Sequence, residues 1–424
     1  MSRSLKVAPG CITKVKLAVK RNHFPSQKAL AIEIGLALST VKNFLNGKPV
    51  DYLNFVEISE KLGLDWQEIA AELVDDSEQQ NNIEELEPLD YKFYVERIPY
   101  ESQCYEEILK PGSLTRIKAP QQMGKTSMLE RVLCRTRKQG YQTLTLSLEL
   151  ADSTVLSDLC RFSQWFCASV SQNLGLPNKL DNYWEDIFGC SSNTTAYFQD
   201  YLLKETTTPF VLAIDKVDLV FEHPGIADDF CRLLRGWYDM ARRGNRIGTI
   251  WQKLRLVVVH STEVYSSLDI NSSPLAGIGL EIELPELSFE QVQELVKRYG
   301  LDWDASQIKQ FMAMVGGHPY LVSKALDYIK LNQVTLEQLL QAAPTEAGPF
   351  SDHLRRHLGN LLKYPELAVA LAEVIQANHW VTIPSTQVFK LHSMGLVKLQ
   401  GNSVMPRCNL YHQYFQEQLT DKCR

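Results

Sequence analysis

The chain has 424 residues, of which 45% are hydrophobic and 22% charged, with a formal net charge of −6. This is the composition of a globular protein with roughly two to four domains. The acidic balance argues against a protein coated with nucleic acid, and no run of eighteen apolar residues or signal-peptide core indicates a membrane partner.

The nine cysteines are scattered along the chain and contain no C-x-x-C pair. This pattern predicts neither a disulfide framework nor a zinc site. A reducing, cytoplasmic location is the simplest interpretation.

Charge is distributed unevenly at the front of the chain. Residues 1–50 contain nine Lys and Arg but one acid, Glu33, whereas residues 75–90 contain seven acids and no base. This contrast predicts a basic module over residues 1–74, joined to the rest by an acidic linker over residues 75–90.

Within this module, residues 26–47 read SQKALAIEIGLALSTVKNFLNG. Ser26 can cap a first helix, Gly35 permits a turn, and Ser39 can cap a second helix that buries its apolar residues. Residues 52–62 and 65–73 would supply closing helices. The spacing resembles an all-α helix-turn-helix of the lambda-repressor type. The candidate DNA contacts are polar residues of these helices and the loop that follows: Gln27, Thr40, Lys42, Asn43 and Lys48.

Contact with DNA is one interpretation of this module. Small helical bundles of the same shape also serve as protein adaptors, and the second helix carries a single base, Lys42, with Lys48 just beyond it. Salt dependence separates the alternatives, because each neutralised phosphate steepens the log–log slope of DNA binding by about 0.9.

Residues 114–127, LTRIKAPQQMGKTS, combine an apolar strand, a loop and the start of a helix. This is the Walker A arrangement: Gly124 lets the main chain approach a phosphate, Lys125 reaches the β- and γ-phosphates, and Thr126 can ligate Mg²⁺. Ala119 stands where the pattern has its first glycine. The motif predicts an ATP or ADP site with Mg²⁺.

Two further apolar runs end in polar residues. Residues 208–215, TPFVLAID, end at Asp215, where a second metal contact is expected, and residues 254–263 end with His260 and Ser261, where a γ-phosphate sensor would lie. With a strand over 143–150 and a helix over 225–243, the alternation predicts an α/β domain with a parallel sheet.

The remaining chain has mainly helical periodicity. Residues 288–300, 304–315 and 319–330 predict a helical lid, and the chain from 364 onward predicts two helices and a hairpin centred on Gly401 and Asn402, as in a winged helix. The expected boundaries are 91–286 for the nucleotide-binding domain, 287–350 for the lid and 351–424 for the winged helix. His392 and Arg407 are candidate phosphate contacts in the winged helix, although each residue type is more often structural at a surface.

Several segments together resemble a known family: FYVERIPYESQCYEEILKPGSLTRIKAPQQMGKTSML, AIDKVDLVF, LRLVVVHSTEVY, ELPELSFEQVQEL and VGGHPYL. From about Tyr91 to the C-terminus, the chain resembles the AAA-like domain of cyanobacterial STAND-type P-loop ATPases. The resemblance implies a P-loop sheet with a helical lid, flanked by the helix-turn-helix and the winged helix. It also implies a nucleotide-driven switch that self-associates in its ATP state and acts through an unidentified effector.

The resemblance places the segment Tyr94–Arg97 and the motif Gly317-His318-Pro319 at the adenine. The predicted metal ligands are Thr126 and Asp215. The predicted nucleotide-binding residues are Ala119, Gly124, Lys125, Thr126, Ser127, Asp215, His260 and Ser261, with Val95, Arg97 and Pro319 added by the resemblance.

The residue after Asp215 departs from the family pattern, because Lys216 stands where an acid would position the attacking water. A charged lysine accepts no proton, and general-base assistance contributes about 10²–10⁴-fold to a rate. We therefore expect at most a slow ATPase. The alternative is that Asp218 or another acid takes this role and Lys216 faces solvent.

Two other functions stay open at this point. One is a DNA-stimulated ATPase that loads or remodels proteins on DNA, which would show DNA-dependent turnover. The other is a scaffold that binds no nucleotide, which the intact Gly124-Lys125-Thr126 sequence disfavours.

Overall fold

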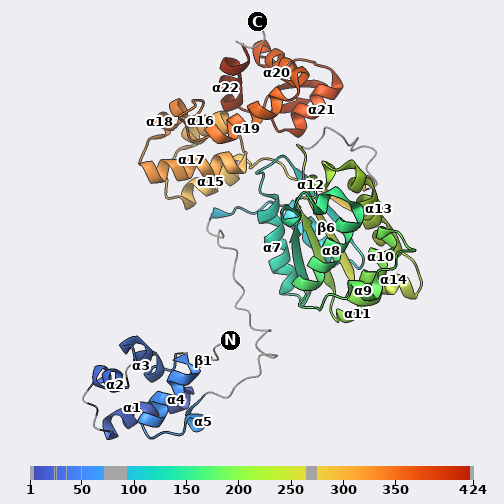
Figure 1. Ribbon diagram of the computed structural model, residues 1–424. Helices are drawn as coiled ribbons and strands as arrows, with labels where there is room; N and C mark the ends of the chain where they lie inside the picture. Colours follow the sequence, from blue (N-terminus) through green and yellow to red (C-terminus); the bar gives the residue numbers. More distant parts are fainter. Residues whose placement is uncertain are drawn as a thin grey trace. The chain divides into compact units, whose positions relative to one another are not determined.

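The computed structural model describes residues 4–70 apart from His23, Pro25, Gly35 and Pro49, and then residues 93–263 and 275–420 (Figure 1). It contains two compact units, Met1–Leu86 and Glu87–Arg424. The predicted linker at 75–90 and the predicted turn at Gly35 lie outside the described residues.

The first unit combines short helices with a two-stranded antiparallel sheet. Its elements are β1 (Ser4–Leu5), the 3-10 turn η1 (Pro9–Cys11), α1 (Ile12–Arg21), α2 (Gln27–Glu33), α3 (Leu38–Leu45), β2 (Val50–Asp51), α4 (Tyr52–Lys61) and α5 (Trp66–Ile69). The four predicted helices correspond to α2 to α5, whereas α1 and both strands were not predicted.

Two contacts in the first unit involve the predicted helix pair, one at the start of α2 and one in the apolar core. The Ser26 hydroxyl accepts the Ala29 amide at 3.1 Å, as predicted for a cap, and Phe44 packs edge-on against Phe55 with ring centroids 4.9 Å apart. The prediction that Ser39 caps α3 is wrong: the cap position is Ala37, two residues earlier, and no side chain caps the helix.

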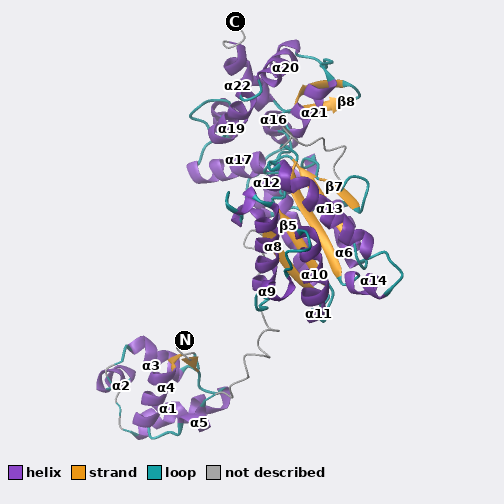
Figure 2. Ribbon diagram, turned by 45° about the vertical axis from the view of Figure 1, so that its right-hand side comes forward, coloured by secondary structure: helices purple, strands orange, loops and turns teal. Residues whose placement is uncertain are grey.

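The second unit is built on a five-stranded parallel sheet with the order β4-β5-β6-β3-β7 (Figure 2). The strands are β3 (Leu114–Ala119), β4 (Gln142–Ser147), β5 (Phe210–Asp215), β6 (Leu254–Ser261) and β7 (Leu280–Glu283). The register pairs Ala119 with Ser261 and Ser147 with Asp215. The carboxyl ends of these four strands therefore meet at one edge, where ligands of such sheets bind.

Helices cover both faces of this sheet, as predicted for an α/β fold. The helices of this layer are α6 (Tyr100–Leu109), α7 (Lys125–Arg137), α8 (Leu159–Asn173), α9 (Leu180–Tyr183), α10 (Cys190–Tyr197), α11 (Leu203–Glu205), α12 (Asp218–Phe221), α13 (Pro224–Met240) and α14 (Arg246–Trp251), with the shorter turns η4 (Leu148–Leu150), η5 (Val155–Ser157) and η6 (Phe198–Leu202). Because side chains alternate along a strand, Val211 of β5 packs toward α6 and α7, whereas Leu212 packs toward α8 and α13. The strand predicted over 143–150 ends at Ser147, where the chain turns into η4.

The rest of the second unit is helical apart from one hairpin. It contains α15 (Phe289–Arg298), α16 (Ala305–Val315), α17 (Pro319–Asn332), α18 (Leu336–Ala342), α19 (Ser351–Leu362), α20 (Pro365–Ala377), α21 (Ser385–Ser393), β8 (Val397–Gln400), β9 (Ser403–Pro406) and α22 (Asn409–Thr420). The predicted lid helices correspond to α15, α16 and α17, and the predicted hairpin turns at Gly401, whose φ is +59°. Helices α18, α19 and α22 were not predicted. One apolar core runs from Val292 of α15 to Phe415 of α22.

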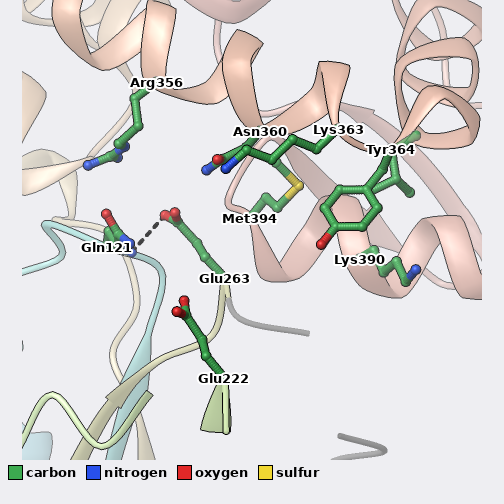
Figure 3. A pocket seen from close by; sticks show the side chains of 10 residues that line it. Gln121, Glu222, Glu263, Arg356, Asn360, Lys363, Tyr364, Lys390 and Met394 are labelled. Carbon is green, nitrogen blue, oxygen red and sulfur yellow. Dashed lines mark hydrogen bonds between the residues drawn. The ribbon is translucent and has the colours of Figure 1, made fainter. Parts of the chain in front are cut away.

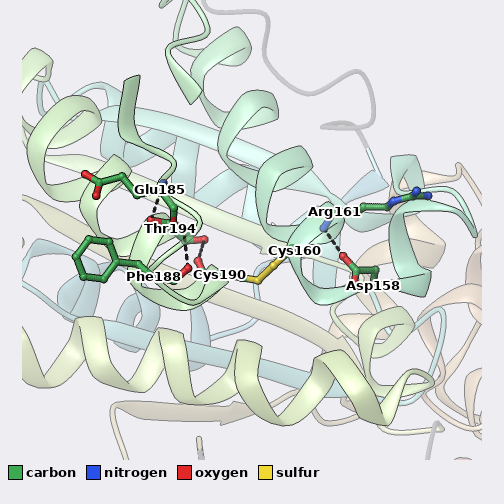
Figure 4. Close-up of a disulfide and its surroundings, with 8 residues drawn as sticks. Asp158, Cys160, Arg161, Glu185, Phe188, Cys190 and Thr194 are labelled. Atoms are coloured by element: carbon green, nitrogen blue, oxygen red, sulfur yellow. Dashed lines mark hydrogen bonds between the residues drawn. A yellow bond between two sulfur atoms is a disulfide. The ribbon is translucent and has the colours of Figure 1, made fainter. Parts of the chain in front are cut away.

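The structure corrects the expectation of reduced cysteines at one place. Cys160 and Cys190 form a disulfide between the starts of α8 and α10, with their Cα atoms 5.1 Å apart (Figure 4). The spacing of the cysteines could not predict this bond, because 30 positions separate the pair and only the fold brings the two residues together. In the described part of the chain, no helix combines the length and apolarity needed to cross a bilayer.

Candidate nucleotide site at the strand ends

The loop between β3 and α7 contains two residues with left-handed backbone conformation. Gly124 has a φ of +83° and Gln122 a φ of +59°. The left-handed region is costly for a residue with a Cβ, so the loop stores strain at Gln122 and needs glycine at position 124. The first amides of a helix have no partner within it, and Gly124, Lys125, Thr126 and Ser127 line the space at the strand ends.

Lys125 is held against this loop. Its Nζ donates to the carbonyl oxygens of Ala119 at 2.9 Å and Pro120 at 2.7 Å. Burial lowers the pKa of Lys125 to about 8. An anion at the loop would favour the charged ammonium, because an opposite charge nearby raises the pKa of a lysine.

The predicted metal ligands lie together. The Thr126 hydroxyl donates to Asp215 Oδ2 at 2.8 Å, and Asp215 is only 5% exposed at the end of β5. The other oxygen, Oδ1, accepts the Lys216 amide at 2.8 Å. The structure therefore brings the loop and the end of β5 together, although Thr126 and Asp215 are 89 positions apart in sequence.

Lys216 has its own place at this edge. Its φ is +61°, and its Nζ forms an ion pair with Glu149 Oε1 of η4 at 3.2 Å. Lys216 does not pair with the nearby Asp218 in the structure, where Asp218 Oδ1 accepts the Ser261 amide at 2.8 Å. The side chains of Lys216 and Glu149 are 42% and 61% exposed, so the ion pair contributes little stability.

These residues line a cavity of about 640 Å³, which we call the strand-end cavity. Its lining includes loop residues, strand ends and two helices of the C-terminal half: Gln121, Gln122, Gly124, Lys125, Thr126, Ser127, Glu149, Asp215, Lys216, Asp218, Leu219, Ser261, Pro319, Tyr320, Ser323 and Arg356.

Of the two predicted sensor residues, the structure brings Ser261 to this cavity and leaves His260 outside its lining. His260 is buried against the Phe221 ring at 5.4 Å, and burial lowers the pKa of its imidazole to about 4. The polar pair at the end of β6 could be seen in the sequence, but the strand alternation sends its two side chains in different directions.

A second cavity of about 540 Å³, the lid cavity, adjoins the first. Its walls are largely apolar, with Phe93, Val95, Leu287, Leu295 and Tyr299 beside polar residues such as Ser323 and Asp327. The two cavities share Gly124, Thr126, Ser127, Pro319 and Ser323.

Arg97 supports the region between the two cavities. It is 4% exposed, and its guanidinium donates to the carbonyl oxygens of Met123 at 2.8 Å and Pro285 at 2.6 Å. Burial lowers the pKa of Arg97. Its resolved contacts therefore fix the loop and the segment before α15.

The predicted lid motif is placed by close packing. The Leu287 amide donates to the Gly317 carbonyl at 2.7 Å, and a Cβ on Gly317 would lie 2.1 Å from the Leu287 carbonyl oxygen. Only glycine fits such an approach, so Gly317 brings Pro319 of α17 to both cavities. His318 is buried beside the His353 ring at 5.5 Å and does not line either cavity.

Arg356 of α19, which no sequence pattern indicated as a site residue, also reaches the strand-end cavity. The helix has a buried face that includes Leu354, His357 and Leu361, but its pattern does not reveal which cation faces the loop. His392 and Arg407, which were considered as phosphate contacts, instead line a separate cavity beside Lys118 and Glu283.

A third cavity of about 320 Å³ lies beyond the strand-end cavity and shares Gln121 and Arg356 with it (Figure 3). We call it the α19 cavity. Its lining comes from strand ends and from α19 to α21: Gln121, Glu222, Glu263, Arg356, Asn360, Lys363, Tyr364, Leu367, Lys390 and Met394.

In the first unit, the candidate DNA contacts differ in exposure. Gln27, Lys42 and Lys48 are exposed, whereas Thr40 and Asn43 are half-buried. The two lysines therefore present the charge of this segment to solvent.

The family profile described as "AAA-like domain" matches residues 83–417. The chain belongs to this family. No protein of curated function matches the sequence of this AAA-like protein significantly.

Among solved structures, the AAA-like protein is similar to a Walker-type ATPase of Pyrococcus abyssi, with a TM-score of 0.55 and 15% identity over 76% of this chain and 96% of that chain. It also matches the Aeropyrum pernix ORC2 protein in its ADPNP–ADP complexes, with a TM-score of 0.44 and 12% identity over 76% and 92% of the two chains. The A. pernix ORC1 protein in complex with DNA matches with a TM-score of 0.40 and 12% identity over 79% and 97%. The P. abyssi likeness shows an α/β fold of the P-loop ATPase kind.

Proposed function

We propose that this AAA-like protein is an ATP- and ADP-binding molecular switch of the STAND type that hydrolyses ATP slowly. The observation that carries the proposal is the pair of adjoining cavities, which differ in chemistry and share the start of α7. A triphosphate needs amides and cations, as in the strand-end cavity, and a purine needs apolar walls, as in the lid cavity.

The residues at the strand ends suit each part of a nucleotide. The amides at the start of α7 and Lys125 would hold the β- and γ-phosphates, and Ser261 would lie near the terminal phosphate. Val95, Tyr299 and Pro319 would enclose the base. In this role Arg97 keeps the loop in position through Met123.

The donor set also fits Mg²⁺. Thr126 and Asp215 offer a hydroxyl and a carboxylate 2.8 Å apart, and Mg²⁺ prefers such oxygen ligands together with water and phosphate. When bound, the ion would neutralise phosphate charge. Thr126 and Asp215 would orient it, since Asp215 is itself fixed by the Lys216 amide.

Slow hydrolysis is proposed because the position after Asp215 offers an ammonium group where a water-activating acid is expected. Asp218 is a poor substitute, since one of its oxygens is already bound to the Ser261 amide. The nucleotide state would then persist and would control self-association, or the binding of DNA or a partner protein by the N-terminal module. We also propose that residues 351–424 form a winged helix.

The proposal predicts that Lys125→Ala weakens the binding of ATP and ADP by about 10- to 100-fold, because charge-assisted hydrogen bonds contribute about 1.5–3 kcal/mol each. Isothermal titration of the purified chain with each nucleotide and Mg²⁺ measures this loss. Lys110→Ala is the matched control, since Lys110 is exposed and pairs with Glu107. A wild-type chain that binds neither nucleotide would disprove the proposal.

For the first unit we propose a helix-turn-helix that contacts DNA, with binding to a partner protein as the alternative. The exposure of Lys42 on α3 and of Lys48 just beyond it supports this proposal. Replacing both lysines by alanine should lower the log–log salt slope of duplex binding by about 1.8, from 0.9 for each phosphate contact. Lys61→Ala, which removes a lysine paired with Glu33, should leave the slope unchanged. A salt-independent interaction would favour the adaptor.

A DNA-stimulated ATPase that loads or remodels proteins is the competing proposal. It requires turnover that rises when DNA is added. The switch instead requires slow turnover and a retained nucleotide, so phosphate release measured with and without DNA separates the two.

A further inference from the structure

Glu263 follows β6 by two residues and reaches back to the loop between β3 and α7. Its Oε1 accepts the Gln121 amide at 2.9 Å. Gln121 lines both the strand-end cavity and the α19 cavity. A loop amide at the edge of the space proposed for the phosphates is therefore already hydrogen-bonded to a carboxylate.

The second carboxylate oxygen of Glu263 has a different environment. It is buried, and within the described part of the chain it has no hydrogen-bond partner. In Figure 3 the side chain points toward Arg356 of α19, and the guanidinium also has a buried Nε without a partner among the described residues.

The charges around Glu263 come from three elements. Burial raises the pKa of its carboxyl, Arg356 of α19 and Lys125 of the loop lower it, and Asp218 after β5 raises it. The Glu263 carboxylate thus interacts with Arg356, Lys125 and the Gln121 amide, which are groups that would also attract a terminal phosphate. Arg356 reaches the strand-end cavity as well.

We propose that Glu263 makes this site prefer ADP over ATP. Like a phosphate, the carboxylate is an anion with acceptor oxygens, and it already accepts the Gln121 amide and interacts electrostatically with Arg356 and Lys125. ADP leaves this contact intact, whereas the γ-phosphate of ATP must approach a like charge or displace it. The inference rests on the proposed nucleotide binding and adds which nucleotide is favoured and by which residue.

The arrangement differs from that of a water-activating base. A base needs an oxygen free to accept a proton from water beside the γ-phosphate. One oxygen of Glu263 accepts a loop amide, and the residue lines the α19 cavity and not the strand-end cavity proposed for the γ-phosphate. Among the described residues, its carboxylate therefore forms a hydrogen bond with an amide of the loop that is proposed to bind phosphate.

The test is Glu263→Gln, which keeps an oxygen for the Gln121 amide and removes the charge. Dissociation constants for ADP and for a non-hydrolysable ATP analogue with Mg²⁺ are measured for the wild type and the variant. The ratio of the ATP-analogue constant to the ADP constant should fall about tenfold, a modest effect for two charges in a partly buried site. The ADP constant should stay within about twofold, which also shows that the site is folded.

Glu222→Gln is the matched control, because Glu222 lines the α19 cavity and is exposed. It should leave the ratio at the wild-type value. Glu263→Asp retains the charge but shortens the reach, so it should lower the ratio by only about threefold, and it serves if the glutamine variant fails to fold.

An unchanged ratio in Glu263→Gln would overturn the inference, as would a loss of phosphate release without a change in the ratio, which would mark a base. If neither nucleotide binds to wild type or variants, the proposed function itself fails. If both proteins bind nucleotide and Glu263→Gln has the same preference for ADP as wild type, only the inference about Glu263 fails and the proposed function stands.

Discussion

At the end of β5, two neighbouring side chains take opposite directions. Asp215 contacts the Thr126 hydroxyl, whereas Lys216 turns to Glu149 with a backbone φ of +61°. A non-glycine residue in the left-handed region costs of order 1–3 kcal/mol, and such strain concentrates at functional sites. The strained turn brings the Lys216 amide to Asp215 Oδ1 and fixes that carboxylate.

Restoring an acid at this position should raise ATP turnover. We expect Lys216→Glu to increase single-turnover phosphate release by up to about 10²-fold, the lower end of general-base assistance. Because the new carboxylate would lie near Glu149, the double variant with Glu149→Gln removes their repulsion and should be at least as fast.

Two controls accompany this experiment. Glu149→Gln alone removes the ion pair without adding an acid, and Lys204→Glu makes the same charge change at an exposed lysine that pairs with Asp200. Both should turn over at the wild-type rate. If neither variant carrying Lys216→Glu is faster than wild type, the explanation of slow hydrolysis through Lys216 is wrong.

At the scale of elements, α19 connects the loop to the C-terminal helix. His353 Nδ1 lies 3.0 Å from Gln122 Oε1, and its Nε2 lies 2.8 Å from the Tyr411 hydroxyl of α22. These contacts fit a neutral imidazole that donates through Nδ1 and accepts through Nε2. The ring of His357 is 4.6 Å away, so a second buried histidine lies beside it.

This arrangement makes stability depend on pH. Burial lowers the pKa of His353 to about 3, below the value of about 6.5 in an unfolded chain. As the pH falls below 6.5, His353 therefore binds a proton in the unfolded state but not in the folded state. The free energy of unfolding decreases progressively until about pH 3. At pH 5 the loss from this one group is about 2 kcal/mol.

Denaturant unfolding at pH 7 and pH 5 measures this loss. In His353→Gln, which can still bond to Gln122 and Tyr411, the difference between the two pH values should shrink by about 2 kcal/mol. His379→Asn, a change at an exposed histidine, should leave the difference as in wild type. The same difference in His353→Gln and wild type would contradict the assigned role of His353.

At the scale of the whole molecule, local patterns predicted the second unit well. The strand that ends at Ala119, the Gly124-Lys125-Thr126 start of a helix and the apolar strand that ends at Asp215 each have a short-range signature. Their meeting follows from the rule that parallel strands present their carboxyl ends at one edge. The likeness to a Walker-type ATPase fold agrees with that part of the prediction.

What the sequence could not predict depends on contacts between distant segments. The Gln121 amide and the Glu263 carboxylate are 142 positions apart, and no periodicity connects them. Arg356 belongs to a helix whose amphipathic pattern fixes its buried face but not its partner. The disulfide between Cys160 and Cys190 has the same origin, because the packing of α8 and α10 brings the residues together.

Hydrogen bonds between the loop region and the C-terminal helices have a consequence for the rate of nucleotide release. His353 holds Gln122, and the Thr262 hydroxyl donates to the Ser393 carbonyl at 2.8 Å. These bonds would have to break before α19 and α21 could move away from a nucleotide bound at the loop. If that movement limits nucleotide release, the bound nucleotide would change slowly. It would not respond to brief changes in the ATP and ADP concentrations.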